Sequence, residues 1–347
     1  MIEKRRYLGL LEGVALVALL VARTISAADW RVQSNIPFHV YGHAAATLQG
    51  KIHLLGGDHT SDWQKPSATH QVYDPVADKW ETKADLPLAL AWEMVSVYRG
   101  KIYVFGGAYY KAGQGITSGD KAWVYDPATD KWSSIHKLPE PRMNGFAATV
   151  GKFIYISLGY DREGPRDGDV KENYRSTHRY DPEKDIYTRV ADAPITGCYI
   201  ASGPYQGKVY AVPGSYVEQG WHKGYQLADG AIVYDPASDR WAKIDAPRVM
   251  KRVFFLTQCS SSAIDADGRL WVVGGMGEDH VRTVVTEYLD IKKAVFVRGP
   301  DIAFGRCCGG GGIANGDTLS IMGGFVDGPD LGNAALPTWT LDTTKLR

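Results

Sequence analysis

Three segments of the chain read almost alike: Val72-Tyr-Asp-Pro-Val-Ala-Asp-Lys-Trp80, Val124-Tyr-Asp-Pro-Ala-Thr-Asp-Lys-Trp132 and Val233-Tyr-Asp-Pro-Ala-Ser-Asp-Arg-Trp241. A fourth copy, Arg179–Tyr187, has Tyr in place of the final Trp, and a fifth, Glu287–Phe296, is degraded. The tyrosines of these five copies fall at positions 73, 125, 180, 234 and 288, a period of a little over fifty residues. Such a period indicates a repeat architecture, in which each unit is one supersecondary structure.

Each unit also contains a glycine turn, a short apolar strand and a double glycine, as in Gly50-Lys-Ile-His-Leu-Leu-Gly-Gly57. The apolar run predicts a buried strand, and the double glycine lets the chain bend where neighbouring strands crowd it. Tyr-Asp-Pro predicts a strand that ends in a turn, because proline cannot donate to the sheet ladder. The aromatic residue after each turn is expected to pack between neighbouring sheets. The unit is therefore four short strands, stacked with its neighbours around an axis.

This pattern resembles the kelch family, whose units carry the Gly-Gly pair, the later Tyr and the Trp six or seven residues after it. The resemblance covers Asp29 to Asp342 and implies an all-β fold, a six-bladed kelch β-propeller. The third and fourth units depart from the pattern, with Leu158-Gly159 and Pro213-Gly214 in place of Gly-Gly.

The closure of the ring is predicted from the two ends of the repeat region. The sixth double glycine, Gly323-Gly324, is followed by Trp339–Asp342, but no further Asp-Lys-Trp strand comes before the chain ends. Trp30 and Pro37 have the same spacing as Trp80 and Pro87. We therefore expect the N-terminal strand to complete the last blade and remove its exposed edge.

The first 28 residues differ from the rest, with three basic residues near the start, an apolar stretch from Leu8 to Ala22 and small residues up to Ala28. This order predicts a secretory signal peptide at 1–28, followed by a single propeller at 29–347. The mature protein is then expected to be periplasmic or secreted, without membrane association after cleavage; a retained N-terminal anchor is the alternative. The chain carries 39 basic and 39 acidic residues, so we expect no nucleic-acid partner, because phosphate contacts need a surplus of basic residues.

The start of each innermost strand is expected to lie at one mouth of the central channel. Counting nine residues back from each turn glycine gives the set Tyr41, Ala91, Arg142, Cys198, Cys259 and Cys307. Counting from the double glycine gives Met143 and Cys308 in the third and sixth units instead. Either count predicts that the cysteines of the last three blades lie at one level near the axis.

Three roles for these cysteines stay open at the level of sequence. They are small buried hydrophobes, or partners in a disulfide across the mouth or between Cys307 and Cys308, or thiols that bind a metal or act in catalysis. The sequence has no C-x-x-C motif, so we expect neither a metal nor a cofactor.

The predicted mouth is rich in aromatic and basic residues. Aromatic rings stack on sugar faces, and arginine forks onto carboxylates. His43 and Glu93 form a candidate acid–base pair, with Arg142 as a third candidate catalytic residue. The candidate ligand-binding residues are Tyr41, Trp92, Asn144, Tyr160, Tyr199, Arg252 and Arg306.

The resemblance extends to the exported six-bladed kelch mutarotases of sialic acid in architecture and length. It implies a small, anionic, sugar-like ligand at the channel mouth, with a mutarotase or epimerase activity. The alternative is a non-catalytic propeller that binds a glycan or a protein partner. A copper radical oxidase is the third alternative, although the chain lacks the additional length of those enzymes.

Overall fold

The structure is a computed structural model that describes residues 29–59, 65–164, 170–217, 225–227, 230–250, 253–257, 263–277, 281–326 and 336–346. The predicted signal peptide, Arg252 and Cys259 lie outside the described residues. Within these ranges, no helix has the length and apolar character needed to cross a membrane.

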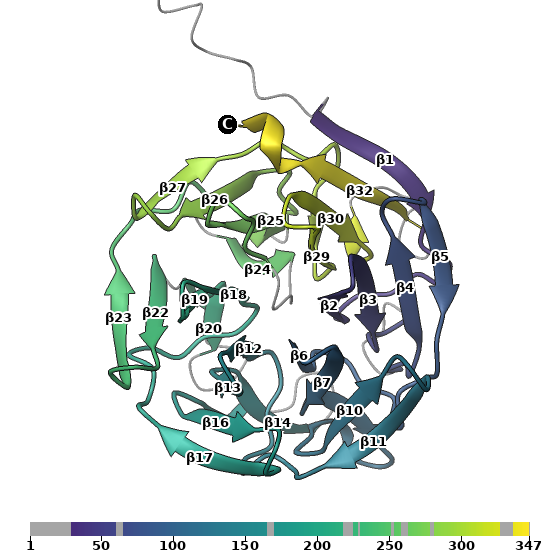
Figure 1. The fold of residues 1–347 in the computed structure, drawn as a ribbon, viewed down its shortest axis with the longest axis vertical. Coiled ribbons are helices and arrows are strands. Elements are labelled where there is room, and N and C mark those ends of the chain that lie inside the picture. The colour runs from purple at the N-terminus through teal and green to yellow at the C-terminus, as the bar shows by residue number, and fades with distance from the viewer. Residues whose placement is uncertain are drawn as a thin grey trace, which may run out of the picture.

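Six four-stranded antiparallel sheets, the blades, surround a central axis (Figure 1). Blades 1 to 3, from the axis outward, are β2 (Ala44–Leu48), β3 (Lys51–Leu55), β4 (His70–Asp74) and β5 (Lys79–Thr82); β6 (Met94–Tyr98), β7 (Lys101–Phe105), β10 (Ala122–Asp126) and β11 (Lys131–Ile135); and β12 (Phe146–Val150), β13 (Phe153–Ser157), β16 (Thr177–Asp181) and β17 (Ile186–Val190).

Blades 4 to 6 follow the same order: β18 (Ala201–Tyr205), β19 (Lys208–Val212), β22 (Ala231–Asp235) and β23 (Arg240–Ile244); β24 (Val253–Thr257), β25 (Arg269–Gly277), β26 (Thr286–Asp290) and β27 (Val295–Arg298); and β29 (Gly310–Ala314), β30 (Thr318–Met322), β32 (Pro337–Asp342) and β1 (Trp30–Asn35). The predicted all-β, six-bladed fold is confirmed.

The repeated Tyr-Asp-Pro segment joins each blade to the one before it. The tyrosines Tyr73, Tyr125, Tyr180 and Tyr234 are buried, and each hydroxyl donates to the aspartate five residues later, at 2.6–2.9 Å. The same aspartates accept a backbone N–H from the preceding blade, the donors being Ser34, Ala84, His136 and Ala191. The sequence repeat is therefore a repeated inter-blade hydrogen-bond site.

The aromatic residue that ends each segment also contacts the preceding blade. The indole N–H groups of Trp132 and Trp241 donate to the carbonyls of Ala84 and Ala191, each at 2.9 Å. The centroid of each indole ring also lies 5.0 Å from the ring centroid of the tyrosine of its own blade. These contacts confirm that the aromatic residues pack between neighbouring sheets.

The N-terminal strand closes the ring as predicted. β1 pairs antiparallel with β32, with Val32 opposite Trp339, and the two strands lie side by side in Figure 1. The indole of Trp30 donates to the carbonyl of Pro300 at 2.9 Å, which ties blade 6 to blade 5.

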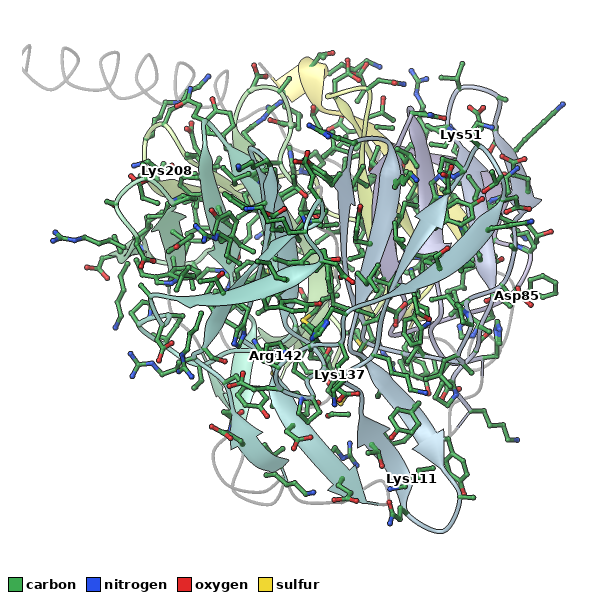
Figure 2. The ribbon with its side chains drawn as sticks, turned by 60° about the horizontal axis from the view of Figure 1, so that its bottom comes forward. Lys51, Asp85, Lys111, Lys137, Arg142 and Lys208 are labelled. Carbon is green, nitrogen blue, oxygen red and sulfur yellow. The ribbon has the colours of Figure 1, made fainter. Side chains whose placement is uncertain are left out.

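A further four-stranded sheet lies outside the six blades and was not predicted from the sequence. This accessory sheet is built from β8 (Ala108–Lys111), β9 (Gly115–Ser118), β14 (Tyr160–Gly164) and β15 (Val170–Asn173), in the order β15-β14-β9-β8. Its strands follow the double-glycine positions of blades 2 and 3. Figure 2 shows it projecting from one face of the propeller, with Lys111 toward its tip.

Candidate functional site

The mouth of the channel is built by equivalent residues that lie three positions before each innermost strand. Tyr41, Ala91 and Met143 form isolated β-bridges with Asp58, Ala108 and Tyr160, the residues that follow each double-glycine position. In blade 6, Cys307 pairs with Phe325 in a short ladder between β28 (Arg306–Cys307) and β31 (Phe325–Val326). The carbonyl of Cys198 accepts the N–H of Gly214 in blade 4.

These pairings decide between the two counts made from the sequence. In blade 3 the mouth position is Met143, so Arg142 lies one residue before it. In blade 6 it is Cys307, because the additional residue of that blade lies in the turn between β29 and β30. Arg142 and Arg306 thus occupy the same position in blades 3 and 6.

The next residue in each described blade mouth has a left-handed backbone. Its φ is +61° at Gly42, +55° at Trp92, +57° at Asn144, +52° at Tyr199 and +58° at Cys308. Glycine adopts this conformation readily, but Trp, Tyr and Cys do so at a cost of order 1 kcal/mol. Such residues persist where the surrounding structure holds them, and they concentrate at binding sites.

Backbone hydrogen bonds connect these positions from blade to blade. Gly42 donates to the carbonyl of Cys308 at 2.7 Å, Trp92 donates to Gly42 at 2.6 Å, and Asn144 donates to Trp92 at 3.0 Å. Blades 6, 1, 2 and 3 are therefore linked in a chain around the mouth. Gly42 has a second role, because a Cβ there would lie 2.6 Å from the indole nitrogen of Trp92. The indole of Trp92 lies across the backbone of blade 1.

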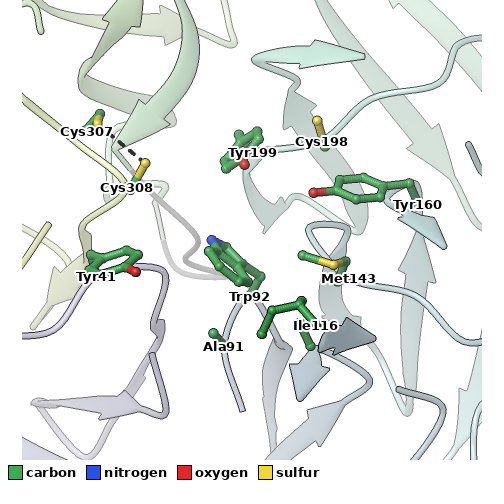
Figure 3. Close-up of a cluster of buried hydrophobic side chains, with 11 residues drawn as sticks. Tyr41, Ala91, Trp92, Ile116, Met143, Tyr160, Cys198, Tyr199, Cys307 and Cys308 are labelled. Carbon is green, nitrogen blue, oxygen red and sulfur yellow. Dashed lines mark hydrogen bonds between the residues drawn. The ribbon is translucent and has the colours of Figure 1, made fainter. Parts of the chain in front are cut away.

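The side chains at the mouth form one buried cluster, which we call the mouth cluster (Figure 3). The ring centroids of Tyr41 and Phe325 are 4.1 Å apart, and Tyr41 meets Trp92 edge-on at 6.4 Å. The members are Tyr41, Ala91, Trp92, Ala108, Ile116, Met143, Tyr160, Cys198, Tyr199, Cys307 and Cys308, with Val170, Met276 and Phe325 packed against them. The described cysteines thus share one level, as predicted, and none of the three forms a disulfide.

The accessory sheet covers part of this cluster. Ile116 of β9, Tyr160 of β14 and Val170 of β15 all belong to it or pack against it. Asn144 donates from Nδ2 to the Tyr160 hydroxyl at 3.1 Å, while its Oδ1 is buried without a partner in the described chain. Burial raises the pKa of Tyr160, so its phenol is neutral at physiological pH. The mouth therefore offers a neutral hydroxyl and an amide oxygen beside aromatic rings.

Three arginines lie next to the mouth cluster. Arg162 is on β14 beside Tyr160, and the Arg282 guanidinium lies 5.5 Å from the centroid of the Phe325 ring. Arg306 precedes Cys307 and is buried, and burial lowers its pKa to about 10. Its side chain therefore remains charged at neutral pH. Arg282 was not among the residues predicted for the mouth, since only its bridge to Met276 of β25 brings it there.

His43 and Glu93 do not face the mouth and are not joined by any hydrogen bond or ion pair among the described residues. Each points from its own blade into the preceding one. A Cβ on Gly310 of blade 6 would lie 2.5 Å from Nε2 of His43, and a Cβ on Gly56 of blade 1 would lie 2.7 Å from Oε1 of Glu93. The two side chains occupy the same place in successive blades, so the blade spacing separates them. We therefore assign no proton transfer to this pair.

The surroundings of both groups keep them uncharged. Burial, followed by the charges of His39 and Arg306, lowers the pKa of His43 to about 3. Burial raises the pKa of Glu93 to about 8, and the N–H of Ala44, 3.4 Å from Oε1, offsets only a small part of that shift. At pH 7 His43 is a neutral imidazole, and Glu93 is mostly a protonated acid.

Arg142 uses its guanidinium to hold blade 3 together. Nη1 donates to the carbonyls of Leu158 and Ser176, and Nη2 donates to the Ser176 hydroxyl at 2.7 Å and to Glu140 at 2.5 Å. The ring of Tyr174 lies 4.6 Å from the guanidinium carbon. These contacts leave Arg142 little capacity to bind a ligand.

Comparisons with known proteins agree with this architecture. A model of the Kelch motif matches residues 94–139. Kelch-like protein terF of Aspergillus terreus is 27% identical over 323 residues, which cover 85% of this chain and 66% of that protein. Kelch-like protein 25 of Xenopus tropicalis is 29% identical over 62% of this chain and 34% of its own length. Beta-scruin of Limulus polyphemus is 25% identical over 67% of this chain, and the chain covers 24% of it.

A solved structure, that of YjhT, superposes with a TM-score of 0.66 at 15% identity, over 89% of this chain and 95% of that one. The fold and the mouth define a six-bladed β-propeller. With its repeated Gly-Gly and Tyr-Asp-Pro units and these relatives, the chain is similar to kelch-repeat proteins. It spans at most two thirds of the length of the curated relatives named here.

Proposed function

We propose that this chain is an exported propeller that binds a small, anionic, sugar-like molecule at the channel mouth. The observation that carries the proposal is the mouth cluster, where the aromatic side chains of Tyr41, Trp92 and Tyr199 come from three different blades. The Arg282 guanidinium lies 5.5 Å from the centroid of the Phe325 ring, which packs against Tyr41, and Arg162 is on β14, two residues after Tyr160. Flat rings beside a guanidinium suit a ligand with a sugar face and a carboxylate.

Export is part of the proposal and is supported by the sequence of residues 1–28, with its basic, apolar and small-residue order. It places the mature protein in the periplasm or outside the cell.

Binding at this site requires a local opening. Trp92 is 3% exposed and Tyr199 is 1% exposed, so a ligand reaches their rings only when the groups packed against them move. Such a step slows association below the usual range for a preformed site.

A mutarotase or epimerase activity is the enzymatic form of this proposal. Opening a cyclic hemiacetal removes a proton from the anomeric hydroxyl and places one on the ring oxygen. The Tyr160 hydroxyl can give its proton to the ring oxygen and regain one from water, and the Asn144 amide oxygen can hold the anomeric hydroxyl by a hydrogen bond while water takes the proton of that hydroxyl. Glu93 and His43 are wedged between blades and do not take part.

The test is calorimetry of the mature protein with sialic and uronic acids, and with neutral hexoses as the matched ligands. We expect the sialic and uronic acids to bind and the neutral hexoses not to bind. We expect Arg282→Gln to weaken the binding of the acids by about 1.5–3 kcal/mol, the scale of a charged hydrogen bond. That is roughly a 10- to 100-fold rise in Kd. The control is Arg99→Gln, which alters an exposed arginine in the turn between β6 and β7, at the end of those strands away from the mouth. Equal binding of acids and neutral hexoses contradicts the proposal.

If the acids bind, the enzymatic form is tested by the rate of anomer exchange, followed by NMR. We expect Tyr160→Phe to slow the catalysed exchange more than it weakens binding. An exchange rate that equals the uncatalysed rate identifies a non-catalytic binding protein.

A protein or glycan partner is the second candidate, and the accessory sheet favours it. The sheet projects from the propeller and carries Tyr110, whose side chain is half-exposed, next to the exposed Lys111 (Figure 2). The variant Lys111→Ala separates the two candidates, because Lys111 lies opposite Gly115 at the hairpin end of β8 and β9, toward the tip of the sheet. It is expected to leave binding of acidic sugars intact.

A further inference from the structure

Cys307 and Cys308 are held in contact at the mouth. Their sulfur atoms are 3.4 Å apart, and both side chains are buried in the mouth cluster (Figure 3). Neither of them forms a disulfide, and neither does Cys198. Figure 3 shows Cys198 on the other side of the Tyr199 ring from this pair. Cys307 and Cys308 are thus placed to react with each other.

A bond between them needs only a small movement of the sulfurs. The S–S bond is about 2.05 Å long, so the two atoms must approach by a little more than about 1 Å. The Cα atoms of adjacent residues are about 3.8 Å apart, which is shorter than the range of about 4.4–6.8 Å that ordinary disulfides span. A disulfide between adjacent cysteines closes a small ring with the peptide that joins them, so it is strained, and strained disulfides are readily reduced.

The backbone around the pair links this bond to the rest of the mouth. Cys308 already has a left-handed backbone, with φ of +58°, and its carbonyl accepts the N–H of Gly42 in blade 1 at 2.7 Å. Cys307 pairs with Phe325, whose ring stacks on Tyr41. Any rotation of the Cys307–Cys308 peptide therefore acts on two contacts of the mouth cluster.

We propose that Cys307 and Cys308 form a reversible dithiol–disulfide site. The oxidant is a disulfide-containing co-reactant, either a small molecule or a protein. One cysteine thiolate attacks the disulfide and releases the first thiol, and the second cysteine then attacks the mixed disulfide and releases the other thiol. Two S–H bonds of the protein and one S–S bond of the co-reactant are exchanged for one S–S bond of the protein and two thiols. The two electrons and two protons pass to the co-reactant.

The experiment is a redox titration of the folded protein in buffers of reduced and oxidised glutathione. Each sample is acid-quenched, its remaining thiols are alkylated, and tryptic peptides are measured by mass spectrometry. Trypsin places Cys307 and Cys308 together in the peptide 307–345, while Cys198 and Cys259 fall in the separate peptides 190–208 and 253–269. The pair can therefore be followed without interference from the other two cysteines.

We expect peptide 307–345 to lose two hydrogens as oxidised glutathione increases, and to regain both alkylation sites after treatment with dithiothreitol. Peptide 190–208 stays alkylated in the same samples and is the internal control. The proposal is overturned if peptide 307–345 carries two alkyl groups at every ratio. It is also overturned if its sulfurs are found bonded to Cys198, to Cys259 or only to glutathione. The titration uses the unmodified protein, so it does not depend on a variant that folds.

Discussion

At the scale of single residues, one position of the repeat carries an arginine with two different surroundings. Arg142 and Arg306 both precede the mouth residue of their blades, and both side chains are buried. Arg142 meets Glu140 and the carbonyls of blade 3. An arginine that donates to backbone carbonyls in this way stabilises the fold. Arg306 instead lies close enough to His43 for its charge to help lower the pKa of that imidazole.

We therefore predict that Arg142→Ala lowers the free energy of unfolding by about 3 kcal/mol, as for the loss of one partner from a buried ion pair. Urea unfolding of the variant and of Arg99→Ala measures the effect. Arg99 pairs with Glu183 on the surface, so its loss costs less than about 1 kcal/mol. An unchanged unfolding midpoint for Arg142→Ala, together with weaker binding of acidic sugars, returns Arg142 to the ligand site.

At the scale of elements, β1 carries the closure of the propeller. It supplies the outer strand of blade 6, and its Ser34 donates to Asp78 of blade 1, the inter-blade hydrogen bond that the repeat forms elsewhere in the ring. Trp30 is buried between blades 5 and 6, in contact with the carbonyl of Pro300. An N-terminal segment far away in sequence thus replaces the part that the last repeat lacks.

Trp30→Ala is expected to lower the free energy of unfolding by about 3–5 kcal/mol, because it leaves a cavity between two blades. The matched control on the same strand is Val32→Ala, whose side chain is 60% exposed, with an expected change within about 0.5 kcal/mol. Thermal unfolding of both variants tests this. Equal melting temperatures for the two variants would show that β1 is not needed for the closed ring.

At the scale of the whole molecule, buried titratable groups lie between the blades, and their protonation is linked to folding. His53 and His70 form a buried pair, 2.8 Å apart, between blades 1 and 2. Burial lowers the pKa of His53 to about 3 and that of His70 to about 4, and it lowers the pKa of His178 to about 4. Glu93 is shifted in the opposite sense, to about 8.

These shifts predict a stability maximum in the region of about pH 6–7. The histidines have folded pKa values below the unfolded value of about 6.5, so their contribution is complete above that pH and is lost as the pH falls. Glu93 has a folded pKa above its unfolded value of about 4.3, so its contribution is complete below that pH and is lost as the pH rises toward 8.

Urea unfolding between about pH 4 and about pH 9 measures this profile. Glu93→Gln keeps the shape of the side chain and removes its titration, so we expect it to flatten the alkaline limb and leave the acid limb unchanged. A wild-type profile whose alkaline limb survives in Glu93→Gln would place the titrating group elsewhere.

The sequence alone was enough to predict the fold, the number of blades and the closure by Trp30–Pro37. The fold and the number of blades depend on residues that interact within one repeat of about fifty positions, so their spacing survives in the linear chain. The closure joins β1 to β32 across the chain, but it could be predicted because Trp30 and Pro37 keep the spacing of the repeat. The Tyr-to-Asp hydrogen bond spans five residues in each copy and is visible as a motif for that reason.

Which residues line the mouth was decided by the tertiary structure. An additional residue in the turn between β29 and β30 shifts the count in blade 6, so pattern counting could not choose between Cys307 and Cys308 as the mouth residue. His43 and Glu93 follow the mouth residues closely in sequence, yet they point between blades, because each left-handed residue before them redirects the chain. Arg282, Phe325 and the accessory sheet reach the mouth from separate repeats. A repeat determines the contacts that recur in every blade, whereas a binding site consists of the contacts in which the blades differ.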